Sequence, residues 1–362
     1  MEWMIYGANG YTGQLIAELA AARGEKPVLA GRSAEKVRPL AEKLSLPWRA
    51  FDLSQPDLRG AALVLHCAGP FSQTYKPMAD ACLAARAHYL DVTGEIEVFE
   101  ALLARDAEAR ERGVVFLPGV GFDVVPSDCL AALLKSQLPS ATRLELAFAP
   151  HGRSSPGTMK TSIESVPKGG LVRRGGKLVK VPAAFEVRTV PFADRPRTAM
   201  SIPWGDVATA FRSTGIPDIT VFMAARPALI RSAKLSRFTG ALLGLAPVQA
   251  FLKNRIERSA RGPNAEERAR GSVQLWGRVS IDAPPSGLRP SPAKPAPPCA
   301  HSVEMTMTVP EGYTFTAEAA LECARRVLAG SVAPGAWTPS LAFGAGFAAS
   351  LPGVRVGEPI RR

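Results

Sequence analysis

A glycine-rich turn near the start of the chain constrains its fold more than any other sequence feature. It follows the apolar run Trp3–Tyr6 and precedes residues 15–20, where leucine, isoleucine and alanine recur at helical spacing. Glycine permits the dihedral angles of a tight turn, lets an anion approach bare backbone and lets a helix pack closely on a strand. The pattern predicts a strand, a turn and a helix whose N-terminal N–H groups bind the diphosphate of a dinucleotide. The residues expected to contact it are Gly7, Asn9, Gly10, Tyr11, Thr12 and Gly13.

The residues at the end of the second predicted strand indicate which dinucleotide the chain binds. Small turn residues between a strand and a helix also occur without a ligand, so the turn alone is weak evidence. After Pro27–Gly31 come Arg32 and Ser33, with Lys36 one helical turn later, where an NAD-binding protein carries an acidic residue for the ribose 2′-hydroxyl. A solvated basic helix start is the alternative, but cations there oppose the helix dipole unless an anion is close. The pattern favours NADP, with these three residues at its 2′-phosphate.

Strands and helices alternate through residues 2–117. Apolar runs near 2–6, 27–31, 48–51, 62–67, 88–92 and 113–117 predict strands, separated by helical patterns such as Glu97–Arg112. This alternation predicts an α/β fold with a Rossmann-type doubly wound parallel sheet. Asp52, at the end of the third strand, is placed either to read the adenine amino group or to cap the following turn.

The loops after the fourth, fifth and sixth strands are expected to face the cofactor, because ligands of such sheets bind beyond the carboxyl ends of the strands. These loops contain the most unusual local sequences of the chain. The predicted cofactor contacts are Ala68, Gly69, Pro70 and Phe71 in the first loop, Thr93 and Gly94 in the second, and Gly119 and Gly121 in the third.

Beyond Pro139 the sequence predicts a second, mainly antiparallel α+β domain, with strands near residues 143–148, 186–190, 218–223, 272–282 and 301–309. Residues 227–270 are basic and helical in pattern, and their apolar patch at 241–248 is far shorter than the roughly 20 residues of a bilayer span. We expect a packing helix, an interfacial anchor or a lid there. Proline and serine over 283–298 predict a mobile connection. Thr316–Leu328 is expected to be a helix capped by Thr316 and followed by Gly330.

Three segments are therefore expected. Residues 1–138 form an NADP-binding domain, residues 139–314 an α+β substrate and dimerisation domain, and residues 315–362 a C-terminal helix and tail that pack back on the first domain. The length of 362 residues suits two hydrophobic cores. No charged leader precedes the first strand, which favours a cytoplasmic protein.

The net charge of +12 does not indicate a nucleic-acid partner, because cations are interspersed with acidic residues and aromatic residues make up only 7% of the chain. Positive potential instead steers anionic ligands, which include NADP itself, an acyl carrier or an anionic membrane surface. The cysteines and histidines are dispersed without the spacing of a metal site, so no metal is expected.

Ordered motifs carry a resemblance to a known family. GANGYTG at 7–13, GRS at 31–33, HCAGPF at 66–71, YLDVTGE at 89–95 and PGVGFDVVPSD at 118–128 resemble the saccharopine dehydrogenase-like oxidoreductases, in particular the bacterial trans-acting enoyl reductases. The resemblance continues at 155–158, 169–173, 202–207, 213–217 and 310–313 and so covers most of the chain. It departs from the family at 283–298, where relatives are expected to have a tighter turn.

The resemblance implies NADP(H)-dependent reduction of an enoyl or carbonyl group in a lipophilic acyl or polyketide-type substrate, free or bound to CoA or a carrier. Hydride addition moves negative charge onto an oxygen and requires a proton donor. The candidate catalytic residues are Tyr75, Asp123, Lys160 and Asp206, and the candidate substrate contacts are Arg173 and Trp204. Each also has a structural alternative: packing for Tyr75, solvation for Lys160 and Arg173, capping for the aspartates, and burial as a turn anchor for Trp204.

Two other functions stay open. A saccharopine-type imine reductase or dehydrogenase is disfavoured, because its substrates carry several carboxylates and amines whereas the expected substrate region is mostly apolar. A non-catalytic NADP-binding partner of a synthase or lipid surface would use the basic region 227–270. A homodimer is compatible with every one of these functions.

Overall fold

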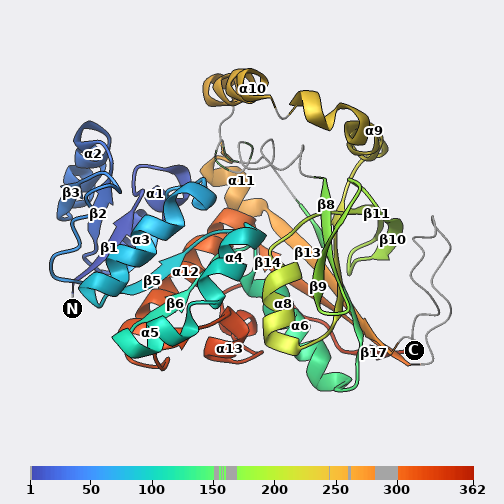
Figure 1. The fold of residues 1–362 in the computed structure, drawn as a ribbon. Coiled ribbons are helices and arrows are strands. Elements are labelled where there is room, and N and C mark those ends of the chain that lie inside the picture. Colours follow the sequence, from blue (N-terminus) through green and yellow to red (C-terminus); the bar gives the residue numbers. More distant parts are fainter. Residues whose placement is uncertain are drawn as a thin grey trace. The chain divides into compact units, whose positions relative to one another are not determined.

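The protein divides into two compact units. The computed structural model describes residues 2–150, 155, 157, 159, 169–243, 245–259, 262–281 and 301–362. Contacts assign Met1–Val125, Asn264–Ala269 and Glu311–Pro352 to the first unit, and Pro126–Pro263, Arg270–Pro310 and Gly353–Arg362 to the second. Both units are drawn in Figure 1.

The first unit is built on a parallel sheet of seven strands in the order β15-β6-β5-β4-β1-β2-β3. Every pairing between neighbours is parallel, so the predicted Rossmann-type sheet is confirmed. The strands are β1 Glu2–Tyr6, β2 Val28–Gly31, β3 Trp48–Ala50, β4 Ala61–His66, β5 His88–Asp91, β6 Val115–Leu117 and β15 Gly335–Ala336. The first six lie within two residues of the predicted ranges.

Helices follow these strands at the expected places. They are α1 Tyr11–Ala22, α2 Ala34–Leu44, α3 Phe71–Ala85, α4 Ile96–Leu103, α5 Asp106–Arg112, α11 Ala265–Arg270, α12 Gly312–Leu328, α13 Pro339–Phe343 and the 3-10 helix η2 Ala348–Ser350. The prediction of a single helix over Glu97–Arg112 is wrong. The chain leaves helical geometry at Arg105 (φ −91°, ψ 20°), between α4 and α5. At this break the Arg105 guanidinium pairs with Asp80 of α3 at 2.7 Å and with Glu108 of α5 at 2.8 Å.

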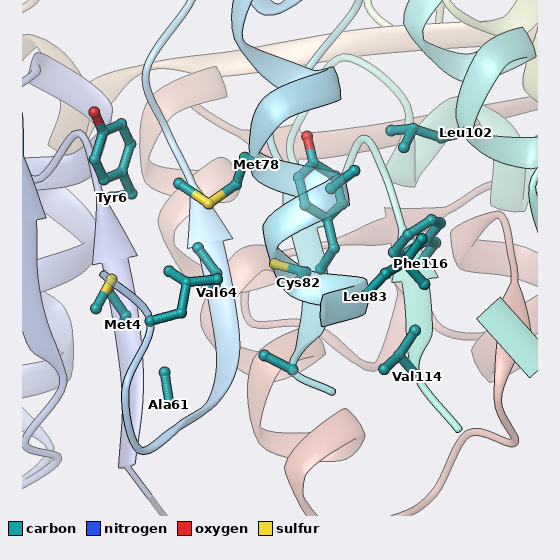
Figure 2. Close-up of a cluster of buried hydrophobic side chains, with 14 of the residues drawn as sticks. Met4, Tyr6, Ala61, Val64, Met78, Cys82, Leu83, Leu102, Val114 and Phe116 are labelled. Atoms are coloured by element: carbon teal, nitrogen blue, oxygen red, sulfur yellow. The ribbon is translucent and has the colours of Figure 1, made fainter. Parts of the chain in front are cut away.

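Both faces of the first sheet are buried. Met4 and Tyr6 point to one face, where they join a core cluster with Met78 and Cys82 of α3 and with Phe116 of β6 (Figure 2). The intervening residues of β1 are buried on the opposite face. Helices α1 and α12 contact each other, and α12 also contacts β4 and β5. Burial on both faces explains why these strands read as continuous apolar runs.

The second unit contains a mixed sheet with the order β10-β11-β12-β7-β13-β14-β16 and side branches. Its strands are β7 Arg143–Ala149, β8 Gly170–Arg174, β9 Lys177–Val181, β10 Val187–Pro191, β11 Pro196–Ser201, β12 Asp218–Ala224, β13 Ser272–Ser280, β14 Ser302–Pro310, β16 Arg355–Val356 and β17 Ile360–Arg361. Only the β7–β12 pairing is parallel among the described strands of this sheet, so the mainly antiparallel prediction is confirmed.

The described helices of this unit are α6 Val125–Gln137, α8 Asp206–Thr214, α9 Pro227–Leu243 and α10 Ala246–Ser259. Together with α11, they confirm the helical prediction for residues 227–270. No helix in the described part of the chain is both long and apolar enough to cross a bilayer. The proline-rich stretch 283–298 lies outside the described residues.

Helix α12 begins earlier than predicted. Its N-cap is Glu311, whose carboxylate accepts hydrogen bonds from the Tyr313 and Thr314 amides at 3.0 Å each. Thr316 is therefore not the cap. Its hydroxyl instead donates to Gly312 O at 2.8 Å and accepts from the Phe122 amide at 3.0 Å. Gly330 follows the helix as predicted, with φ +73°.

Candidate cofactor site

The turn after β1 is packed so tightly that it accepts only glycine at two positions. The amides of Gly7 and Ala8 both donate to Ala30 O of β2, at 2.8 and 3.1 Å. Gly7 has φ +85°, and a Cβ on Gly13 would stand 2.4 Å from Gly7 O. Backbone from β1, β2 and the start of α1 is thus held together without intervening side chains.

The N-terminus of α1 fits an anion. The first intrahelical hydrogen bond runs from the Gln14 amide to Gly10 O at 2.9 Å, so the N–H groups of Thr12 and Gly13 precede the helical ladder. The N-cap residue of this helix is Gly10, which has no side chain to cap it, and the first turn contains no acidic residue. Positive dipole charge at this end is therefore left for a ligand.

The side chains of the predicted turn residues lie in different environments. Asn9 is exposed, and its Oδ1 atom is 2.8 Å from where a Cβ on Gly31 would stand. Arg268 donates to the Tyr11 hydroxyl at 3.0 Å, and the Tyr313 ring meets the Tyr11 ring edge-on at 4.9 Å. Burial raises the pKa of the Tyr11 hydroxyl. The side chain of Tyr11 is therefore held by contacts with Arg268 and Tyr313.

Exposed cations follow β2. Arg32 and Lys36 are exposed and form no ion pair within the described part of the chain, in contrast to Arg38 of α2, which pairs with Glu42 at 2.7 Å. Ser33 is in the N-cap position of α2, but its hydroxyl accepts no hydrogen bond from the helix. All three side chains are thus available to a phosphate at the end of β2.

Asp52 acts as the turn cap that was one of its two predicted roles. Its Oδ1 atom accepts from the Ser54 amide at 2.9 Å, and hydrogen bonds from Ser54 lower the pKa of this exposed carboxyl. Its charge is also felt by the nearby Tyr6 hydroxyl, whose pKa burial and Asp52 raise to about 12.

The loops after β4 and β5 are joined through Glu95. Its two carboxylate oxygens accept from the amides of Phe71 at 2.8 Å and Ser72 at 2.9 Å, at the start of α3. On the other side of the β4 loop, a Cβ on Gly7 would stand 2.8 Å from the Ala68 amide nitrogen. The structure thus brings the predicted residues Ala68, Gly69, Pro70 and Phe71 beside the glycine-rich turn.

Asp91 joins the β5 and β6 loops. Its buried carboxylate accepts from the amides of Thr93 at 3.0 Å and Gly119 at 2.8 Å and from the Tyr89 hydroxyl at 2.7 Å. Burial raises the pKa of this carboxyl to about 6, against the opposing effect of these three hydrogen bonds. The loops that contain Thr93, Gly94, Gly119 and Gly121 are therefore fixed to one buried acid.

Asp123 lies at the same edge of the sheet. A Cβ on Gly94 would stand 2.7 Å from Asp123 Oδ2, so the carboxyl rests directly against the β5 loop. Burial raises the pKa of this carboxyl to about 7. An aspartate that titrates near neutral pH can hold or release a proton under ordinary conditions.

Tyr75 and the second-unit candidates are placed as follows. Tyr75 is half-buried and packs against the core cluster under α3.

Arg173 is buried, donates to Val207 O at 2.7 Å and Gly176 O at 2.8 Å, and stacks over the Phe211 ring. Trp204 is half-buried with its ring 4.5 Å from Phe148, and Asp206 is buried in the first turn of α8. Lys160 lies outside the described residues.

Two acids that organise the site, Asp91 and Glu95, and the α12 cap Glu311 were not predicted. Asp91 and Glu95 stand in the motif that drew attention to the β5 loop, and an acid at the carboxyl end of a parallel strand was the available signal for Asp91. Glu311 was missed because glutamate is not among the preferred N-cap residues. Within the described residues, no group of three or more potential ligands could hold a metal ion.

Comparison with known proteins identifies the nucleotide-binding part. Residues 3–117 match the family model described as the saccharopine dehydrogenase NADP binding domain. A saccharopine dehydrogenase-like oxidoreductase from Homo sapiens is 29% identical over 150 residues, which cover 34% of this chain and 35% of that protein. A trans-acting enoyl reductase from Mycobacterium ulcerans (strain Agy99) is 31% identical over 145 residues, covering 35% and 34%. The matches thus span about a third of these relatives.

Solved structures extend the likeness in fold to the whole chain. Apo saccharopine dehydrogenase (L-Glu forming) from Saccharomyces cerevisiae superposes with a TM-score of 0.65 at 10% identity, covering 100% of this chain and 99% of that one. Amine dehydrogenase from Mycobacterium smegmatis gives 0.50 at 11% identity, with 97% and 96% covered. The second, mixed sheet is therefore part of a shared architecture. Residues 3–117 thus resemble the saccharopine dehydrogenase NADP binding domain, and the cofactor of this nucleotide-binding part is NADP.

Proposed function

We propose that the protein is an NADPH-dependent oxidoreductase that reduces an enoyl or carbonyl group of a lipophilic acyl-type substrate. The observation that carries this proposal is the set of groups at one edge of the first sheet. They comprise a helix N-terminus whose N-cap is a glycine, exposed cations after β2 and an aspartic acid with a pKa of about 7. The first two suit a dinucleotide with an extra phosphate, and the third suits proton transfer.

In this proposal the chain holds the cofactor through two elements. The N-terminal N–H groups of α1 bind the diphosphate, and the glycines of the turn keep side chains away from it. Arg32, Ser33 and Lys36 bind the 2′-phosphate and so exclude NADH, which lacks that charge. NADPH, when bound, supplies the hydride for the reduction.

Asp123 is the proposed proton donor. Reduction of a double bond requires one proton besides the hydride, and an acid with a pKa of about 7 is protonated in a large fraction of molecules at neutral pH. The Glu95 and Asp91 contacts hold the loops on either side of it in place. Tyr75 is less suited to this role, because its ring belongs to the core packing.

The names of the relatives and the apolar residues of the second unit support a lipophilic substrate. One matched relative is named a trans-acting enoyl reductase. In the second unit, half-buried Trp204 lies against Phe148, and Ile202 and Met223 are partly buried beside Met200. An acyl chain carried on CoA or a carrier protein suits such side chains. Arg173 is engaged by backbone carbonyls, so it would shape this region through α8.

Cofactor titration tests the binding half of the proposal. NADPH is expected to bind more tightly than NADH, with binding followed by nicotinamide fluorescence. Arg32→Ala should weaken NADPH binding about tenfold or more, since a charge-assisted hydrogen bond contributes about 1.5–3 kcal/mol, and should leave NADH binding unchanged. Arg38→Ala is the matched control, because that cation is exposed on the helix that follows Arg32 but is paired with Glu42. Equal effects of the two substitutions would contradict the assignment of Arg32.

Turnover tests the chemical half. NADPH oxidation is measured with enoyl-CoA, aldehyde and imine acceptors, using the wild type and Asp123→Asn. Consumption with an enoyl or carbonyl acceptor, reduced in the variant, supports the proposal. Tight NADPH binding without turnover on any acceptor would favour the non-catalytic accessory function, and turnover confined to imines would favour the saccharopine-type reaction.

A further inference from the structure

Several exposed apolar side chains lie on or directly beside two helices of the second unit, α9 and α10. Phe251 and Leu235 have the largest exposed fractions of any large apolar residue in the described part of the chain, 64% and 61%. Leu229 and Leu245, on the same two helices or directly beside them, are 49% and 50% exposed. The helices contact each other and are drawn in gold in Figure 1. Grouped apolar side chains at the surface mark a site of interaction.

These side chains are not needed to attach the helices. Helix α9 is anchored by Ile230, which is 7% exposed and packs with Ala184 and Met200, and by partly buried Ala233 on the same face. Helix α10 has its own buried residue, Ile256. Among the described side chains, each helix therefore packs through residues other than the exposed leucines and Phe251.

Basic residues predominate on these two helices. Residues 226–259 contain one acidic residue, Glu257, and seven basic ones, Arg226, Arg231, Lys234, Arg237, Lys253, Arg255 and Arg258. Arg226, Arg231 and Lys234 are exposed and form no ion pair with any described residue. Apolar groups mixed with unpaired cations on a helix are the composition of elements that lie in the headgroup region of anionic bilayers.

We propose that α9 and α10 bind the surface of an anionic lipid bilayer, with Leu229, Leu235, Leu245 and Phe251 entering the interface and the cations meeting lipid phosphates. A second copy of this chain fits the surface less well, because a twofold interface would place the same cations against each other. This inference goes beyond the proposed reaction and does not depend on it.

Vesicle sedimentation tests the proposal with the full chain. The protein is mixed with sucrose-loaded vesicles of phosphatidylcholine alone or with phosphatidylglycerol. Binding is expected to the mixed vesicles, to weaken as salt is added, and to be about tenfold or more weaker on phosphatidylcholine alone. The double variant Leu235→Asp/Phe251→Asp and the double variant Arg231→Glu/Lys234→Glu should each reduce binding by about tenfold or more.

The matched controls carry the same changes elsewhere in the second unit. They are Leu178→Asp/Ile360→Asp, at exposed apolar residues, and Lys177→Glu/Lys180→Glu, at exposed cations of β9. Unchanged vesicle binding in both controls, with NADPH affinity kept in all four variants, supports the proposal. No binding to anionic vesicles, equal loss in controls and variants, or a dimer in sedimentation velocity that only Leu235→Asp/Phe251→Asp dissolves would overturn it.

Discussion

The contact between Gly13 and Gly7 shows how single residues determine the nucleotide-binding turn. A Cβ on Gly13 would stand 2.4 Å from a backbone carbonyl oxygen, which cannot rotate away, whereas a Cβ on Gly10 would stand 3.2 Å from the same atom. The requirement for glycine at position 13 is therefore steric as well as functional. The sequence pattern predicted these positions correctly because close packing of helix on strand has no substitute for glycine.

Alanine substitutions at Gly13 and Gly10 should differ in their effects, because the two added Cβ atoms would stand at different distances from Gly7 O. Gly13→Ala is expected to lower the free energy of unfolding by about 1–3 kcal/mol, the range for overpacking, and to weaken NADPH binding. Gly10→Ala should lower the free energy of unfolding by a smaller amount. Gly346→Ala is the control, since a Cβ there meets no atom within 4 Å. Urea denaturation and NADPH titration measure both effects, and equal stability of the Gly13 and Gly346 variants would contradict the packing argument.

Titration of Asp123 should appear in the pH dependence of stability. The folded-state pKa of about 7 lies above the value of about 3.9 for an unfolded aspartate. Between these values the folded state holds a proton that the unfolded state has released, so this group destabilises the fold increasingly as pH rises from about 4 to 7. The difference in unfolding free energy between Asp123→Asn and wild type should therefore grow in favour of the variant over that window, by up to about 1.4 kcal/mol per pH unit.

Urea denaturation at several pH values measures this difference. Asp91, whose pKa is raised to about 6, is present in both proteins and cancels in the comparison. A difference that stays constant between pH 4 and 7 would show that burial does not raise the pKa of Asp123.

At the level of helices and strands, the sequence predicted the strands of the first sheet well and the helix ends poorly. Period and apolar content located β1, β2, β4, β5 and β6, because burial on both faces leaves little choice of residue. The break between α4 and α5 lies where Arg105 pairs with Asp80, and α12 begins after its cap, Glu311. Such side-chain contacts across the fold leave no periodic signal, so the sequence could not predict them.

The cap on α3 is the clearest of these contacts to test. Glu95→Ala removes the acceptor of the Phe71 and Ser72 amides and should lower the free energy of unfolding by about 1–2 kcal/mol, the effect of losing a helix cap. Glu95→Gln keeps an acceptor oxygen and should lower the free energy of unfolding by a smaller amount. Glu111→Ala, at an exposed glutamate of α5, controls for the loss of an acid. Thermal or urea unfolding with equal midpoints for the alanine variants would exclude the capping role.

At the level of the whole molecule, the order of segments in space differs from their order in sequence. The first unit takes in Asn264–Ala269 and Glu311–Pro352 after the chain has built most of the second unit. Local patterns predicted both kinds of sheet, but a discontinuous unit is defined by contacts between distant residues. The same holds for the site, where the glycine-rich turn and the cations after β2 were predicted from local motifs and the organising acids were not.

This arrangement makes the first unit depend on the C-terminal segments. Phe315 and Leu321 of α12 are buried, α12 contacts α1, β4 and β5, and β15 adds the last strand to the parallel sheet. Truncation after Pro310 should therefore abolish NADPH binding and cooperative unfolding of the first unit, because it exposes the apolar surface that α12 covers. Truncation after Pro352 removes only β16 and β17, which pair with β14 in the other sheet, and should keep NADPH binding. NADPH titration and urea unfolding of both proteins measure this, and full affinity after truncation at Pro310 would show that residues 1–125 form the cofactor site without α12.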